Sequence, residues 1–265
     1  MTKIIFFDID GTLVSFRTHA IPPSAIEAVR RIRQKGVKVW IATGRPIPFI
    51  DHLEGLEYDG IMCVNGAYCL TRDGKALRYN PVPKSDVLRM IEEQKRSGMA
   101  VCYAGVDRAI LTAPKGIPDD VGSVFSLLDI KQPDIYEPDE ALAFDVMQVI
   151  AFFRHEQTVH ITSEVLMGCN VLRWHPLFTD CVAKGTDKAA GIEAVIRHYG
   201  FDISETMAFG DGGNDIPMLR LAGIGVAMGN ASQEVKDVAD IVTSSVDDNG
   251  VANVLDRLNG VFYES

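Results

Sequence analysis

The chain has 265 residues, of which 47% are apolar, so it can bury the core of one large domain or of two unequal ones. Acidic residues outnumber basic ones 36 to 26. The formal net charge of −10 argues against a nucleic acid or an anionic membrane as partner, because the protein would be repelled by both. The most apolar internal stretch, 146–153, is too short to span a bilayer.

The cysteines indicate a reducing compartment. They are odd in number and form neither a CxxC pair nor a cysteine/histidine metal motif, so we expect reduced, mostly buried thiols at positions 63, 69, 102, 169 and 181. The N-terminal apolar run ends at Phe7, before charged residues appear, and does not resemble a signal peptide. We therefore expect a cytoplasmic protein, either a monomer or a weak homo-oligomer.

The first eighty residues alternate between strand and helix patterns. Apolar runs predict strands at 3–7, 37–42 and 60–64, and an amphipathic pattern that ends before Gly36 predicts a helix at 23–34. Repeated units of this kind indicate a parallel sheet with helices on both faces.

The pattern changes after residue 67 and returns after residue 184. A hairpin around Asp73-Gly74 is followed by a helix at 85–96 and strands at 99–103, 109–112 and 170–174. Further βα units then predict helices at 186–199, 216–222, 232–238 and 251–258 and strands at 206–209, 225–227 and 240–243. The predicted fold is an α/β, doubly wound parallel sheet (Rossmann-like) formed by residues 1–81 and 183–265, with an inserted α+β domain at 82–182.

Four polar clusters follow predicted strands, at 8–12, 43–45, 65–66 and 210–215. A single aspartate after a strand is better explained as a helix cap than as part of a site. Ligands of open parallel sheets bind beyond the carboxyl ends of the strands, however, so four clusters there favour a site. Asp8 and Asp10 at about 5 Å would repel by roughly 3 kcal/mol at a dielectric near 20, which favours a divalent cation between them.

In these clusters the chain resembles the phosphatases of the haloacid dehalogenase superfamily. It is most similar to the Cof type, which carries an inserted α+β cap, and within that type to the bacterial sugar-phosphate phosphatases. The resemblance covers residues 4 to about 243. Its motifs are Asp8-Ile9-Asp10-Gly11-Thr12-Leu13, Thr43-Gly44-Arg45, Asn65-Gly66-Ala67, Lys184-Gly185 and Gly210-Asp211-Gly212-Gly213-Asn214-Asp215.

The resemblance implies a Mg²⁺-dependent phosphatase. Asp8 would be the nucleophile that forms an aspartyl-phosphate, and Asp10 would be the general acid and base. Mg²⁺ would bind the Asp8 carboxylate, the Asp10 backbone carbonyl and the Asp211 carboxylate, with Asp215 as a further ligand or an outer partner. From the residues alone, Asp215 could equally be the cap of the next helix, and Thr12 a turn cap.

The same resemblance places the phosphoryl group against Thr43, Gly44 and Lys184. Asn214 would position Lys184 or the phosphate.

The inserted domain would contact the rest of a phosphorylated small molecule, which we expect to be a hexose or pentose phosphate. Arg173 and Trp174 are the candidates in this domain, and Asp180, at the return to the core, is another. Arg45, beside the phosphate site, is a further candidate for contacts with the sugar. Trp174 could instead lie in the core of that domain, with the Arg173 stem packed along it.

Two alternatives remain. A phosphomutase of the same superfamily would share the two aspartates and could carry a similar cap. A phospho-aspartate signalling or ligand-binding module also combines acids, threonine and lysine at a sheet edge, but receiver domains are about half this length.

Overall fold

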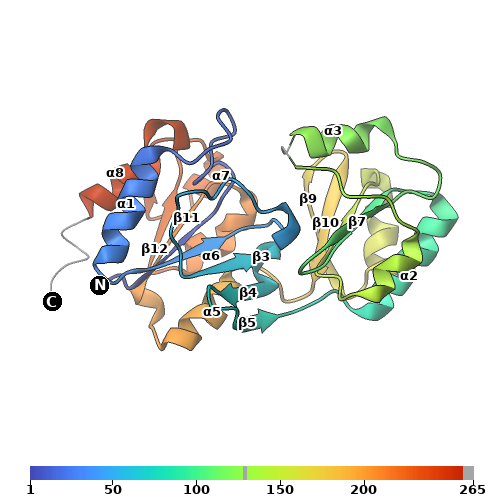
Figure 1. The fold of residues 1–265 in the computed structure, drawn as a ribbon, viewed down its shortest axis with the longest axis horizontal. Helices are drawn as coiled ribbons and strands as arrows, with labels where there is room; N and C mark the ends of the chain where they lie inside the picture. Colours follow the sequence, from blue (N-terminus) through green and yellow to red (C-terminus); the bar gives the residue numbers. More distant parts are fainter. Residues whose placement is uncertain (128–129, 259–265) are drawn as a thin grey trace. The chain divides into compact units, whose positions relative to one another are not determined.

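The computed structural model describes residues 1–127 and 130–258 (Figure 1). The chain forms two compact units. The first contains Met1–Gly44, Asp51–Tyr79 and the described residues from Asp187 onward, and the second contains Arg45–Ile50 and Asn80–Thr186. Residues 45–50 were predicted to belong to the first domain, but they belong to the second unit, where Phe49 packs in a hydrophobic core.

The described part of the first unit contains one eight-stranded sheet, in which strands from both ends of the chain lie side by side (Figure 1). Six neighbouring strands pair in parallel. Their order is β13 (Ile241–Val242), β12 (Ile224–Ala227), β11 (Thr206–Gly210), β1 (Ile4–Phe7), β2 (Lys38–Ala42) and β3 (Gly60–Cys63). The antiparallel strands β4 (Tyr68–Thr71) and β5 (Ala76–Tyr79) complete the sheet. The predicted α/β fold is confirmed.

Apolar faces of helices cover this sheet. Helix α1 (Pro23–Gln34) buries Ala25, Ala28, Val29 and Ile32, which recur at helical spacing, and it packs beside α8 (Gly250–Arg257) (Figure 1). Residues of α5 (Lys188–Tyr199) and α6 (Ile216–Leu221) share a core with Ile4 and Phe6 of β1. A short helix, α7 (Gln233–Lys236), follows β12. Because both faces of β1 are covered, its four residues are all buried.

The second unit contains a five-stranded sheet in its described residues, and every pair in it is antiparallel. The order is β7 (Ala109–Thr112), β6 (Val101–Ala104), β8 (Gln148–Ala151), β10 (Phe178–Ala183) and β9 (Cys169–His175). Helices α2 (Lys84–Ser97) and α3 (Asp119–Leu127) pack with these strands. Strand β10 was not predicted, because Thr179 and Asp180 interrupt its apolar run although both are buried.

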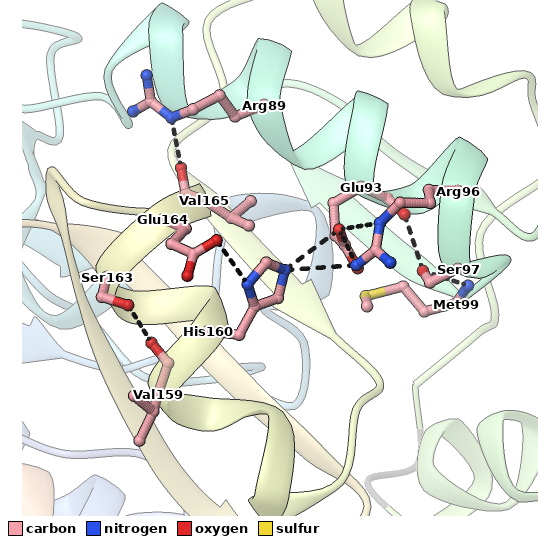
Figure 2. Close-up of polar contacts among 10 residues, drawn as sticks. All are labelled: Arg89, Glu93, Arg96, Ser97, Met99, Val159, His160, Ser163, Glu164 and Val165. Atoms are coloured by element: carbon pink, nitrogen blue, oxygen red, sulfur yellow. Dashed lines mark hydrogen bonds and ion pairs between the residues drawn. The ribbon is translucent and has the colours of Figure 1, made fainter.

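A short helical segment in the second unit lies against α2. It runs through α4 (Thr158–His160) and a wider helical turn at Ile161–Val165. The Arg89 guanidinium of α2 donates to the Val165 carbonyl, and His160 lies beside Glu93 (Figure 2). These contacts join two elements about seventy residues apart in the sequence.

All five cysteines are buried, and none forms a disulfide, as the sequence predicted. Burial raises the pKa of the Cys69 thiol to about 12, so it remains protonated at neutral pH. Within the described residues no helix is both long and apolar enough to cross a membrane.

Candidate active site

The first acidic residue of the site follows the central strand β1. The Asp8 amide donates to the Phe209 carbonyl of β11 at 3.0 Å, which extends the sheet pairing by one residue. The chain then turns sharply, since the amides of Leu13 and Val14 both donate to the Ile9 carbonyl. Gly11 has φ +82°, and a Cβ there would lie 2.2 Å from Asp211 Oδ2, so this turn requires glycine.

The neighbouring strand β11 brings a second group of acids to the same edge. Asp211 follows β11 directly, and Asp215 precedes α6. Carboxylate oxygens of Asp8, Asp211 and Asp215 all lie within 4.8 Å of one another. Three of the predicted acidic residues therefore lie close together, although Asp8 and Asp211 are 203 residues apart in the sequence (211 − 8).

Negative charge dominates this cluster. Burial raises the pKa of Asp8 well above its ordinary value, and Asp215 raises it further, while Lys188 opposes the shift. Burial and Asp215 also raise the pKa of Asp211 to about 7, against a hydrogen bond from Thr12 and the charge of Lys188. One lysine does not balance three carboxylates, so the site attracts additional positive charge.

The lysine of the site is Lys188, which corrects the prediction of Lys184. Lys188 is fully buried, and its Nζ lies 2.6 Å from Asp8 Oδ1 and 2.5 Å from Asp215 Oδ1. Burial alone would lower its pKa, but Asp215 and Asp8 together outweigh burial, so its pKa is raised. Lys184 is exposed in the second unit, just after β10, with its amide bonded to the Gly168 carbonyl.

The start of α5 explains this difference. The predicted helix began at 186, but Asp187 is the N-cap and accepts from the Ala190 amide, which makes Lys188 the first helical residue. A cation is unfavourable at a helix N-terminus. The two carboxylates offset this cost and hold the ammonium group in the site.

Both oxygens of Asp215 are already bonded. Oδ1 accepts from Lys188, and Oδ2 accepts from the amides of Asp211 and Gly212, each at 2.9 Å. Asp215 thus orients Lys188 and fixes the turn that carries Asp211. Thr12 was also open to interpretation as a turn cap only. In the structure its hydroxyl donates to Asp211 Oδ1 at 3.2 Å.

The second cluster of the sheet edge links three loops. Thr43 is buried after β2, and its carbonyl accepts from the Asn65 amide. Asn214 donates its amide hydrogen to Asn65 Oδ1 at 2.9 Å, so its recorded side-chain partner is Asn65 and not Lys184. A Cβ on Gly44 would lie 3.2 Å from Asn65 Oδ1, so the three loops meet closely here.

The residues predicted to contact the rest of the substrate belong to the second unit. Arg45 donates to the Phe49 carbonyl at 2.9 Å. Arg173 donates to the Phe153 and Pro176 carbonyls and lies over the Phe153 ring, so its recorded contacts stabilise this unit. Trp174 is on β9, but its side chain is outside the described residues. Their contacts with a substrate stay predictions.

Two residues of the site were missed by sequence reasoning. Lys188 is one. The sequence feature that could have identified it is its place directly after Asp187, the aspartate that caps the helix. The other is Asn230, which donates to Asp211 Oδ2 at 3.0 Å. It follows β12, so the rule that polar residues gather after parallel strands could have identified it.

Comparison with known families identifies the protein class. Residues 5–255 match the family model of haloacid dehalogenase-like hydrolases. YkrA of Bacillus subtilis is 33% identical over 263 residues, which cover 97% of this chain and 98% of YkrA. The chain belongs to the haloacid dehalogenase-like hydrolases and is an enzyme.

Solved structures of related enzymes share the architecture over 97–98% of the chain. The subclass IIB sugar phosphatase BT4131 of this superfamily is 38% identical, with a TM-score of 0.87 and coverage of 97% of this chain and 99% of that one. The phosphatase BT1666 from Bacteroides thetaiotaomicron is 36% identical, with a TM-score of 0.88 and coverage of 98% of this chain and 96% of that one.

A further relative by sequence is the pyridoxal phosphate phosphatase YbhA of Escherichia coli. It is 29% identical, and the match covers 91% of this chain and 93% of YbhA.

Proposed function

We propose that the protein is a Mg²⁺-dependent phosphatase that hydrolyses sugar phosphates through an aspartyl-phosphate on Asp8. One observation carries this proposal: a buried aspartate at the end of the central strand contacts a buried lysine at 2.6 Å, within a cluster of further carboxylates. Such an aspartate is a nucleophile suited to an anionic substrate, provided that cations offset the surrounding charge.

The residues of the cluster suit a magnesium ion. Mg²⁺ prefers oxygen ligands and binds proteins through one or two carboxylates, with the remaining positions left to water and phosphate. Asp8 and Asp211 would hold it, together with the Asp10 backbone carbonyl. Asp215, which already accepts hydrogen bonds from Lys188 and from two backbone amides, would be a further ligand or an outer partner. When bound, the ion would offset negative charge on the phosphoryl group.

The protein groups would then carry out two displacements. An Asp8 oxygen attacks phosphorus while the ester P–O bond breaks, and Asp10 gives its proton to the departing alkoxide. Asp10 next takes a proton from water, whose oxygen attacks the phosphorus of the aspartyl-phosphate and releases inorganic phosphate and the Asp8 carboxylate. Lys188 would hold Asp8 in place and oppose the charge of the phosphoryl oxygens, with Thr43 and Gly44 as further contacts.

The substrate proposal is supported by similarity. BT4131, at 38% identity, is named a sugar phosphatase, whereas YbhA, at 29%, is named for pyridoxal phosphate. We therefore propose hexose and pentose monophosphates as the preferred class.

A panel of phosphorylated compounds tests this function. Released phosphate would be measured with Mg²⁺ or with EDTA for hexose phosphates, pentose phosphates, pyridoxal phosphate and nucleotides. We expect Mg²⁺-dependent release that is fastest with the sugar phosphates. Release only with pyridoxal phosphate or nucleotides would refute the substrate class. Isomerisation of a sugar phosphate that requires a bisphosphate activator would indicate the phosphomutase instead.

A further inference from the structure

Asn230 lies between the two halves of the acidic site. Its side-chain amide donates to the Gly11 carbonyl at 2.9 Å and to Asp211 Oδ2 at 3.0 Å. Gly11 belongs to the turn that follows Asp10, and Asp211 follows β11, so one amide group connects the two loops that carry the acids of the site.

Each carboxylate oxygen of Asp211 accepts one hydrogen bond from a side chain. Thr12 donates to Oδ1 and Asn230 to Oδ2. A carboxylate with both oxygens bonded has a defined orientation, and its other lone pairs can still accept a cation. Asn230 also restrains the Gly11 carbonyl, one residue after the Asp10 carbonyl.

The loop that presents Asn230 is itself fixed. The Met228 amide donates to the Gly210 carbonyl at 3.0 Å, and the Gly229 amide donates to the Ser244 carbonyl at 3.0 Å. The Asn230 carbonyl oxygen Oδ1 accepts from the Val246 amide at 3.1 Å, which sets the direction of the amide donors. The position of Asn230 is therefore set by β11 and by the 244–246 segment before any ligand binds.

We propose that Asn230 is a positioning residue that orients Asp211 and the turn after Asp10 for the divalent cation. The inference rests on the proposed function, because it assigns the cation to the same site. Hydrogen-bond partners of metal ligands typically change metal affinity by about 10- to 100-fold when they are removed. We expect the lower end of this range, because Thr12 still holds the other oxygen of Asp211.

The test compares Asn230→Leu and Asn230→Ala with Asn253→Ala. Both Asn230 variants lose the donor, and leucine keeps nearly the shape of asparagine. Asn253 is the matched control, because its amide donates to Ser244 Oγ and to the Asp248 carbonyl, in the same segment, but it has no recorded contact with Asp211. Its replacement disturbs the segment without removing the bond under test.

Mg²⁺ affinity would be measured without substrate, by calorimetry and by the rise in Tm as Mg²⁺ is added. We expect both Asn230 variants to bind Mg²⁺ about tenfold more weakly, and Asn253→Ala to bind like the wild type. Phosphatase activity of the Asn230 variants should return at high Mg²⁺, with an unchanged KM for the sugar phosphate.

The outcomes separate the two proposals. Wild-type affinity in both Asn230 variants would overturn the role of Asn230 and leave the phosphatase proposal intact. An equal loss in Asn253→Ala would also overturn it, since the effect would then come from the segment. A wild-type protein that neither binds Mg²⁺ nor hydrolyses any monophosphate would instead refute the proposed function.

Discussion

Two clusters of charged side chains, one in each unit, differ in ways that separate a reactive site from a structural contact. In the first unit, Asp8, Asp211 and Asp215 face Lys188, and the Lys188 side chain has 0% exposure. In the second unit, Glu93 and Glu164 face Arg96 and His160, and the Arg96 side chain is 69% exposed (Figure 2). Both clusters join segments far apart in the sequence.

The difference is one of contact with water. In the second cluster Glu93 is buried, but Arg96, His160 and Glu164 are partly or largely exposed, so solvent screens their contacts. The first cluster is buried and has more carboxylates than cations, which raises the pKa of Asp8 and Asp211. A fold retains such unbalanced charge at a cost to its stability, so the imbalance indicates a ligand that supplies the missing positive charge.

The largest expected effect is that of Asp8→Asn. An amide cannot attack phosphorus, so the rate of phosphate release should fall on the order of 10⁶-fold, as it does when other enzymes lose their nucleophile. Circular dichroism should show an intact fold, since asparagine has the same shape. Near-normal turnover in the purified variant would rule out Asp8 as the nucleophile.

The second-largest expected effect is that of replacing Lys188, and it distinguishes Lys188 from Lys184. Lys188→Met should reduce kcat by about 10²- to 10³-fold, because a group that opposes charge in the transition state is lost. In EDTA it should also lower the free energy of unfolding by about 3–5 kcal/mol, because two buried carboxylates lose their partner. Urea unfolding and steady-state kinetics provide the measurements.

Lys184→Met is the matched control for this experiment. Its side chain is exposed in the second unit, so both kcat and stability should match the wild type. If Lys184→Met lost activity and Lys188→Met kept it, the assignment of the lysine made here would be reversed.

The third effect concerns pH. In the metal-free protein Asp211 has a pKa of about 7, above its ordinary value of 3.8, so the folded state binds the proton more tightly than the unfolded state. Stability from this group is therefore complete below pH 3.8 and is lost as the pH rises through about 7. We expect the free energy of unfolding in EDTA to fall between about pH 4 and pH 7, and to fall less in Asp211→Asn.

Added Mg²⁺ completes this test. At pH 8 it should raise the Tm of the wild type, because it binds the ionised carboxylates of the folded state. It should have little effect on Asp211→Asn. An equal rise in both proteins would mean that the ion binds elsewhere.

The smallest effect is expected in the second cluster. Glu93→Gln should change the free energy of unfolding by no more than about 1 kcal/mol, since Glu93 is buried but its partner Arg96 is exposed and His160 is partly exposed. Phosphate release should be unchanged. A loss of activity comparable to that of Lys188→Met would show that the two clusters are not as different as their burial indicates.

Similar limits of prediction appear in both units. Buried apolar runs predicted β1, β2 and β3, because parallel strands covered on both faces lack polar interruptions. The same reasoning failed for β10, an interior strand, because Thr179 and Asp180 are polar although buried and interrupt its apolar pattern. Arg173 was selected for its chemistry, but its backbone partners depend on how β9 and β10 pair.

The sequence by itself determined the parallel sheet and the acids after its strands, because burial patterns and strand-end motifs are properties of short segments. Only the tertiary structure decided which cation meets those acids and what holds them. Lys188 and Asp8 are 180 residues apart, and Asn230 and Gly11 are 219 apart. Local patterns can mark Lys188 and Asn230 as candidates but do not give their partners, because the contacts arise when parallel pairing places β11 and the loop after β12 next to β1.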